Sequence, residues 1–184
     1  DTRWVAEKAV PNAGGRRHRN HKVYDNFCKG GRYGIAMYFS DGSVIRNNRT
    51  EDNVRCLVLH VNGRFNKIFD NQVLDYTTGI LLAYEAEQNE VYNNTLRRRA
   101  GWHFNGSGQG HIVCYVQPTK NTIRNNKCFC DDDGSPSWGI FVAINATGNV
   151  VEGNEIYGKV GRSAIVLESS WGGTADNGIT YSVF

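Results

Sequence analysis

Two short stretches of the chain hold ionisable side chains in the pattern of a reactive or metal-binding site. In the first, RRRAGWHFNGSGQGH at residues 97–111, three arginines precede two histidines. Guanidinium groups can hold the carboxylate of an acidic sugar, and a nearby histidine can abstract a proton from it. The candidate catalytic residues of this stretch are Arg97, Arg98, Arg99, His103 and His111.

The second stretch, CDDDGSPSW at residues 130–138, contains three consecutive aspartates. Carboxylate oxygens are the ligands that Ca²⁺ prefers, so Asp131, Asp132 and Asp133 are candidate calcium ligands, and no other cofactor is expected. The competing interpretation is that the arginine and aspartate runs pair with each other as a surface network, which stabilises little per pair. The sequence leaves both interpretations open.

These stretches interrupt a repeat that organises most of the chain. In each repeat an Asn, Ser or His lies two residues before an apolar anchor, and an Asn lies three residues after it. The anchors are 22, 23, 23, 32 and 28 residues apart, and the two longer spacings contain the two stretches. A period near 23 residues indicates a repeat architecture. The anchors are Val23, Ile45, Ile68, Val91, Ile123 and Val151.

A second apolar segment follows each anchor and is too short to bury a core alone. Stacked coils solve this, because each strand then pairs with its counterpart one coil away, about 4.8 Å along the axis. We expect both apolar columns to line the interior, with asparagines at the bends hydrogen-bonding amide to amide. The second column contains Ile35, Leu57, Ile80, Ile112, Ile140 and Ile165.

The motif Asn-x-[Val/Ile]-x-x-Asn followed by Gly-Ile-x-Leu resembles the right-handed parallel β-helix superfamily, with its pectate-lyase-like folds and carbohydrate-binding repeats. The resemblance implies an all-β, right-handed parallel β-helix solenoid of about 6–7 coils with two loop insertions. It implies no particular chemistry, because one fold hosts many functions. The Asp-Pro-His motif of mannuronan epimerases is absent, as are the paired-Asp and Gly-His-Gly elements of polygalacturonases, so no catalytic set carries over.

The repeats span residues 20–184, and residues 1–19 are expected to form a lead-in segment. The motif returns at 177–182, 28 residues after Val151, and the chain stops before that coil is complete. An uncapped solenoid end invites pairing. We therefore expect a piece of a longer β-helix, or an end that another chain covers.

Composition and charge indicate which classes of partner to exclude and where the protein is located. A net charge of +3 is too weak to predict nucleic-acid binding, and no apolar run is long enough to enter a membrane. The expected location is extracellular or on the cell surface, with Asn93, Asn105 and Asn145 as candidate glycosylation sites. Among five cysteines, Cys130 is the best candidate for a disulfide because it opens a loop.

Two columns on the second strand should point outward and are candidate binding surfaces. One is apolar throughout, and contiguous apolar surface usually marks a contact with another molecule. The next is partly aromatic and can stack sugar rings. The candidate binding residues are Val58, Leu81, Val113 and Phe141 in the apolar column and Tyr38, His60 and Tyr115 in the aromatic one.

Two functions of different class follow. The first is an extracellular structural or interaction module that assembles with neighbouring chains, or with the rest of a longer β-helix, and binds glycan. The alternative is a lyase or epimerase that acts on an acidic polysaccharide where the two insertions meet. Because the insertions fall at corresponding positions in consecutive coils, we expect them to lie side by side.

Overall fold

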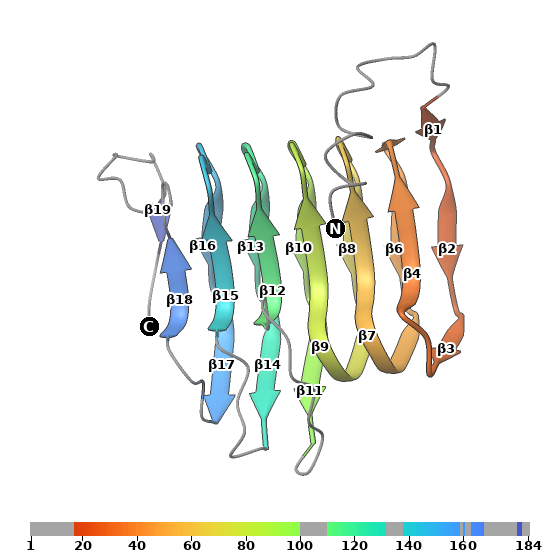
Figure 1. The fold of residues 1–184 in the computed structure, drawn as a ribbon, viewed down its shortest axis with the longest axis vertical. Coiled ribbons are helices and arrows are strands. Elements are labelled where there is room, and N and C mark those ends of the chain that lie inside the picture. The colour runs from red at the N-terminus through yellow and green to blue at the C-terminus, as the bar shows by residue number, and fades with distance from the viewer. Residues whose placement is uncertain are drawn as a thin grey trace.

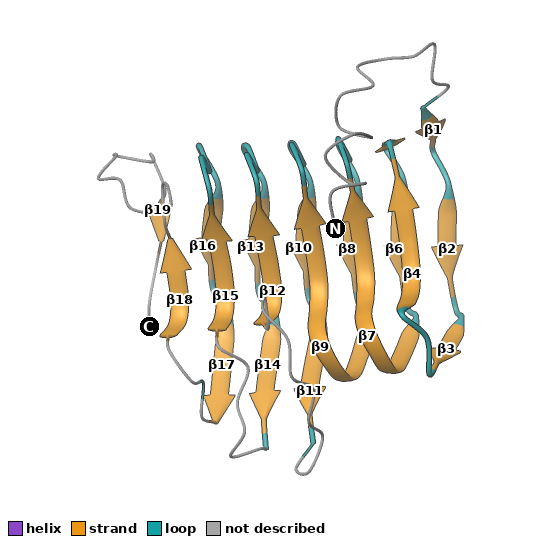
Figure 2. Ribbon diagram, viewed as in Figure 1, coloured by secondary structure: helices purple, strands orange, loops and turns teal. Residues whose placement is uncertain are grey.

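The computed structural model describes residues 17–99, 110–131, 138–158, 160, 163–167 and 180–181. Within these residues all regular secondary structure is β-strand, and every pairing between strands is parallel. Figure 1 shows the coils stacked side by side in sequence order, and Figure 2 shows how little of the described chain lies outside strands. The all-β parallel β-helix expected from the repeats is confirmed. The described residues contain no helix that is long and apolar enough to cross a membrane.

Two sheets form the walls of the solenoid. The seven-stranded sheet contains β2 (Lys22–Tyr24), β6 (Val44–Arg46), β8 (Lys67–Phe69), β10 (Glu90–Tyr92), β13 (Thr122–Arg124), β16 (Val150–Glu152) and β19 (Thr180–Tyr181). The ten-stranded sheet contains β3 (Phe27–Lys29), β4 (Tyr33–Tyr38), β7 (Arg49–His60), β9 (Gln72–Ala83), β11 (Thr95–Arg98), β12 (Gly110–Tyr115), β14 (Lys127–Cys130), β15 (Trp138–Ala143), β17 (Glu155–Gly158) and β18 (Ser163–Leu167). A two-stranded sheet pairs β1 (His18–Arg19) with β5 (Ser40–Asp41).

The ten-stranded sheet has two arms, because β7 and β9 run through a corner that the other coils break into separate strands. The first arm contains β3, β11, β14 and β17, and the second contains β4, β12, β15 and β18. Both insertions lie between the arms, after β11 and after β14. The same corner of the solenoid therefore carries both, as expected.

The interior columns follow the predicted register. Ile45 pairs with Ile68, Ile68 with Val91, and the series continues through the coils. The second column pairs Leu57 with Ile80 and Ile80 with Ile112 in the same way. Both columns belong to one hydrophobic core in which most members are fully buried. Burying a side chain of this size stabilises the fold by about 1.5–3 kcal/mol.

Two ladders of asparagine amides mark the bends on either side of the seven-stranded sheet. Asn48 donates from Nδ2 to Oδ1 of Asn71 at 3.0 Å, and Asn71 donates to Asn94 at 2.9 Å. Asn66 and Asn89 begin the second ladder with a 2.9 Å bond. Each amide also donates to a backbone carbonyl, so these buried polar groups are satisfied. Placement in the first ladder also shows that the sequon asparagine Asn48 points inward.

Two expectations from the sequence are wrong in detail. The returning motif predicts that Ile179 stacks on Val151, but β19 places Tyr181 there. A shift of two residues keeps the same face inward, so the pattern alone does not resolve it. None of the five cysteines forms a disulfide. Cys130 pairs in register with Arg98 and Gly158, so no cysteine faces it.

Candidate functional site

The turn between the second arm and the seven-stranded sheet presents the same polar pattern on four consecutive coils. Each turn carries one polar side chain, then another two residues later, and the second ladder asparagine two residues after that. Isolated parallel bridges align the second position of each turn from coil to coil. The pairs are Asn62 with Arg64, Glu85 with Glu87, Gln117 with Thr119, and Asn145 with Thr147.

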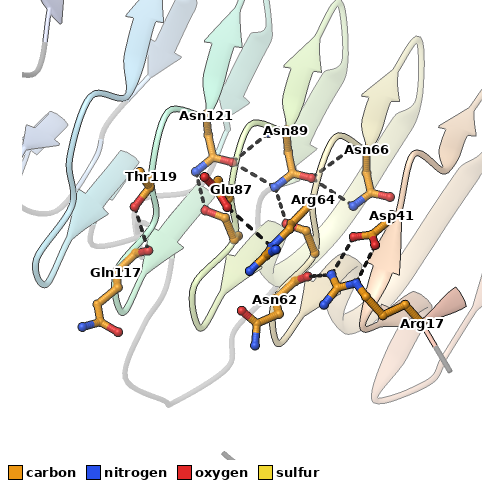
Figure 3. A network of polar contacts seen from close by, with 12 residues as sticks. Arg17, Asp41, Asn62, Arg64, Asn66, Glu87, Asn89, Gln117, Thr119 and Asn121 are labelled. Atoms are coloured by element: carbon orange, nitrogen blue, oxygen red, sulfur yellow. Dashed lines mark hydrogen bonds and ion pairs between the residues drawn. The ribbon is translucent and has the colours of Figure 1, made fainter. Parts of the chain in front are cut away.

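All of these side chains except that of Thr147 line a groove of about 410 Å³. Figure 3 labels five of them, Asn62, Arg64, Glu87, Gln117 and Thr119. The groove extends over four coils, and all seven of its lining residues occupy the two polar positions of the turns. Pockets of this size accommodate small ligands or one stretch of a longer chain. Its lining residues are Asn62, Arg64, Glu85, Glu87, Gln117, Thr119 and Asn145.

The backbone of these turns adopts a conformation that most residues avoid. Val61 and Asn62 have φ angles of 59° and 53°, and Val116 and Ile144 have 61° and 60°. A β-branched residue in the left-handed region costs about 1–2 kcal/mol. Hydrogen bonds to the next coil stabilise this strained backbone, because Asn62 N donates to Tyr84 O at 2.7 Å. The same left-handed φ recurs at another bend of the coils, at Asn47, Asp70 and Asn93, so it is a general feature of the bends of this solenoid.

The ion pair between Arg64 and Glu87 in the groove is loose. Arg64 Nε lies 3.5 Å from Glu87 Oε2, and both side chains remain partly exposed. That separation is long for a hydrogen bond, so both groups keep capacity for an incoming hydroxyl. At one end Arg17 donates from Nη2 to Oδ1 of Asp41 at 2.6 Å and also to the carbonyl of Asn62, as Figure 3 shows.

A line of aromatic rings lies beside the groove. Tyr38 and His60 have ring centroids 5.2 Å apart, His60 and Tyr84 5.0 Å, and Tyr84 and Tyr115 5.5 Å. The structure thus brings together all three aromatic residues predicted from the sequence. It adds Tyr84, which spans the coil where the column itself holds Ala83. Burial, with a smaller effect from Arg55, lowers the pKa of His60 to about 4, so this ring is neutral at neutral pH.

The apolar column predicted as a contact surface lies beneath these rings. Val58, Leu81, Val113 and Phe141 point away from the interior core and form a second cluster, with exposures between 0 % and 8 %. Tyr84, Tyr115 and Trp138 are among the aromatic residues packed against it. No lateral partner is needed to shield this column, so assembly with neighbouring chains stays a prediction.

At the corner that carries the insertions, two of the predicted arginines are held by carboxylates. Arg97 Nε lies 2.7 Å from Asp131 Oδ2, which joins the stems of the two insertions. Arg99 donates from Nε to Asp75 at 2.6 Å and from Nη2 to Glu51 at 3.0 Å. Hydrogen bonds from Arg49 and Arg99 lower the pKa of Glu51 to about 2.

The other candidates of the corner point into the solenoid or lie outside the described residues. Arg98 and His111 are buried, and His111 shares a hydrogen bond between Nδ1 and the hydroxyl of Tyr76. Burial, followed by the charge of Arg98, lowers the pKa of His111 to about 3. Four candidates lie outside the described residues: His103, Asn105, Asp132 and Asp133. The candidate glycosylation sites Asn93 and Asn145 are described, and both side chains are exposed.

Comparison with known proteins identifies one family. A family model described as periplasmic copper-binding protein (NosD) matches residues 13–107. The match includes the first half of the groove, up to Glu87. Neither the comparison with curated proteins nor that with solved structures found a match.

The described residues do not fit a copper centre. Copper favours cysteine, methionine and histidine ligands, yet within the described ranges no three His, Cys, Asp or Glu side chains converge. His18 and His21 come near each other, with ring centroids 5.6 Å apart, but they are only two. Cys114 and Cys128 are buried, and burial raises the pKa of both thiols.

Proposed function

The chain belongs to the NosD family of periplasmic proteins, which places it outside the cytoplasm as expected, and we propose that it binds a polysaccharide chain along its groove. The proposed ligand lies parallel to the solenoid axis and contacts one turn in each coil. Within this proposal the chain is related to the pectate-lyase-like and carbohydrate-binding β-helices through its asparagine ladders and Gly-Ile strands.

One observation carries the proposal, which is that the same pair of polar positions recurs on four stacked turns. The turns repeat at the strand spacing, about 4.8 Å, which is close to the length of one sugar unit in an extended chain. Amide groups can donate to and accept from sugar hydroxyls, and carboxylates can accept from them. The adjoining rings of Tyr38, Tyr84 and Tyr115 offer apolar surface to the C–H face of a sugar.

The alternative of a lyase or epimerase at the corner rests on fewer available groups. Arg97 and Arg99 are engaged with carboxylates, and His111 lies in the interior, where a polysaccharide does not reach it. His103 is the base that this alternative retains. The geometry of the described residues therefore supports binding in the groove better than catalysis at the corner.

Calorimetric titration with neutral linear hexose oligomers of increasing length tests the proposal. We expect affinity to rise with each added sugar until the oligomer spans the groove, and then to level off. Gln117→Ala should weaken binding about tenfold, because the loss of hydrogen bonds to a ligand costs about 1.4 kcal/mol. Lys120→Ala is the matched control, because this exposed residue lies on the same turn but outside the groove.

Each outcome decides the matter. Equal affinity in Gln117→Ala and Lys120→Ala, with the melting temperature unchanged in both, would place the ligand elsewhere. A flat titration with every neutral oligomer would remove groove binding of neutral glycans. Release of unsaturated sugars from an acidic polysaccharide, lost in His103→Ala, would favour the enzyme.

A further inference from the structure

The outer face of the seven-stranded sheet carries a row of cations that the groove does not use. Lys22 on β2, Arg46 on β6 and Lys67 on β8 lie on three consecutive coils of this face. Lys22 and Lys67 occupy one outward column with Val44 between them, and Arg46 occupies the neighbouring column. Each coil thus contributes one cation, and the cation of the third coil, Lys67, is shared with Glu90 of the next coil.

We propose that Lys22, Arg46 and Lys67 form a track that binds a linear polysaccharide with one carboxylate on each sugar. The track is independent of the groove and recognises a different chemical class of glycan. Neighbouring coils are about 4.8 Å apart, so successive cations advance along the axis at nearly the rise of a sugar chain.

Arg46 differs from three of the other stacked arginines, whereas Arg32 and Arg55, which both stack on Tyr33 of the ten-stranded sheet, also lack an ion pair with a described carboxylate. Arg49, Arg97 and Arg124 each lie over an aromatic ring and each have a carboxylate partner from the described residues. Arg46 lies over Tyr24, 4.8 Å from the ring centroid, and forms no ion pair with a described carboxylate. Its charge is therefore available to an external anion.

The stacking of Arg46 prepares it for this role. A guanidinium held against a ring loses less conformational freedom on binding than one that moves freely in solvent. Its planar edge can donate two parallel hydrogen bonds to one carboxylate, and it is more weakly hydrated than an ammonium group. Lys22 also forms no ion pair with a described residue, and its side chain lies at the start of the track.

The track ends after the third coil because the next side chain in its column is an acid. Glu90 is the register partner of Lys67, and its Oε1 lies 3.0 Å from Lys67 Nζ. Arg124, one coil further on, is turned toward the same carboxylate at 3.4 Å. A polyanion continuing beyond Lys67 would meet this negative charge, so we expect the site to hold about three sugar units.

Calorimetry with oligouronates of increasing length, beside neutral oligomers of the same lengths, tests the track. We expect uronates to bind, with affinity that rises up to the trimer and then levels off. Added salt should weaken this binding, because it screens exposed charges. Arg46→Gln should lower the affinity about tenfold, and Arg46→Lys should fall between that variant and the original chain.

Two variants sharpen the assignment. Arg49→Gln is the matched control, because Arg49 is also stacked on a ring but is paired with Glu51, and it should leave uronate affinity unchanged. Glu90→Gln removes the acid that ends the track and releases both Lys67 and Arg124, so the trimer should bind more tightly and the gain should be larger for longer uronates.

The opposite outcomes overturn the proposal. Uronates that bind no better than neutral oligomers, or equally well to Arg46→Gln at an unchanged melting temperature, would remove the track. Binding of sulfated but not carboxylated chains would contradict the ligand class. Failure here leaves groove binding untouched, because that is measured with neutral oligomers and Gln117→Ala.

Discussion

The groove and the corner that carries the insertions differ in how their polar groups are used. At the corner, Arg99 is held by two carboxylates that are themselves nearly buried, Asp75 and Glu51. In the groove, the pair Arg64–Glu87 is longer and more exposed. Of the charged residues that the sequence singled out at the corner, Arg97 and Arg99 are thus occupied by contacts within the fold, whereas Arg64 and Glu87 of the groove are only loosely paired.

This contrast has a physical origin in the repeat. The described stems of the two insertions are joined by an ion pair between side chains, Arg97–Asp131. The turns of the groove are supported by backbone hydrogen bonds from coil to coil, such as Glu85 N to Val116 O at 2.8 Å. The backbone of these turns is therefore held independently of side-chain ion pairs.

The largest expected loss of stability comes from a substitution in the hydrophobic core that supports both regions. Ile80→Asp places a carboxylate at a fully buried position without a partner, which costs several kcal/mol. Ile80→Val is the matched control and should cost about 0.5–1.5 kcal/mol. Urea unfolding followed by circular dichroism measures both. An unchanged unfolding midpoint for Ile80→Asp would contradict the interior placement of this column.

The next prediction compares how much a carboxylate contributes to stability at the corner and in the groove. Asp75 accepts hydrogen bonds from Arg99 N at 2.8 Å and from Arg99 Nε at 2.6 Å. Asp75→Asn should cost about 1.5–3 kcal/mol, as expected for hydrogen bonds to a charged group. In the groove, Glu87→Gln should stay within about 0.5 kcal/mol, because its ion pair is exposed. Equal losses in the two variants would erase the distinction between a structural corner and a binding groove.

The interior could be predicted from the sequence because the repeat fixes the register. Once Ile45, Ile68 and Val91 are aligned, the alternation of strand residues assigns the inward and outward columns. The asparagine ladders follow from the same alignment. The shift at Tyr181 escaped prediction because the pattern does not distinguish registers that differ by two residues.

The groove could not be recognised in the same way, because its residues look like ordinary solvated turns. Asn62, Glu85 and Gln117 share neither residue type nor charge, so they do not form a motif by composition. What they share is their position four residues before a ladder asparagine, which becomes meaningful only when the coils are stacked. Tyr84 was not predicted for a related reason: it follows Ala83, the member of the aromatic column in its coil, and therefore lies outside that column in the sequence pattern.

A smaller effect appears in acid and tests the network around Glu51. Its carboxyl has a pKa of about 2 in the folded chain, against an ordinary value of 4.5. Between these values the unfolded chain binds a proton that the folded chain does not, so stability falls as the pH is lowered from about 4.5 toward 2. Glu51→Gln should flatten this part of a plot of urea midpoint against pH. Identical slopes in the two proteins would show that the arginines do not hold Glu51.

The smallest expected effect lies at Asp131, and it decides whether the corner is only structural. The pair Arg97–Asp131 is exposed, so Asp131→Asn should change stability by less than about 1 kcal/mol. If Asp131 were instead a calcium ligand, Ca²⁺ would raise the melting temperature of the original chain, and this variant would lose the shift. We expect no calcium shift, because the carboxylate is engaged by Arg97, and Asp131→Asn should also leave oligosaccharide affinity in the groove unchanged. A calcium-dependent melting temperature that the substitution abolishes would make the corner a metal site and reverse the comparison between the two regions.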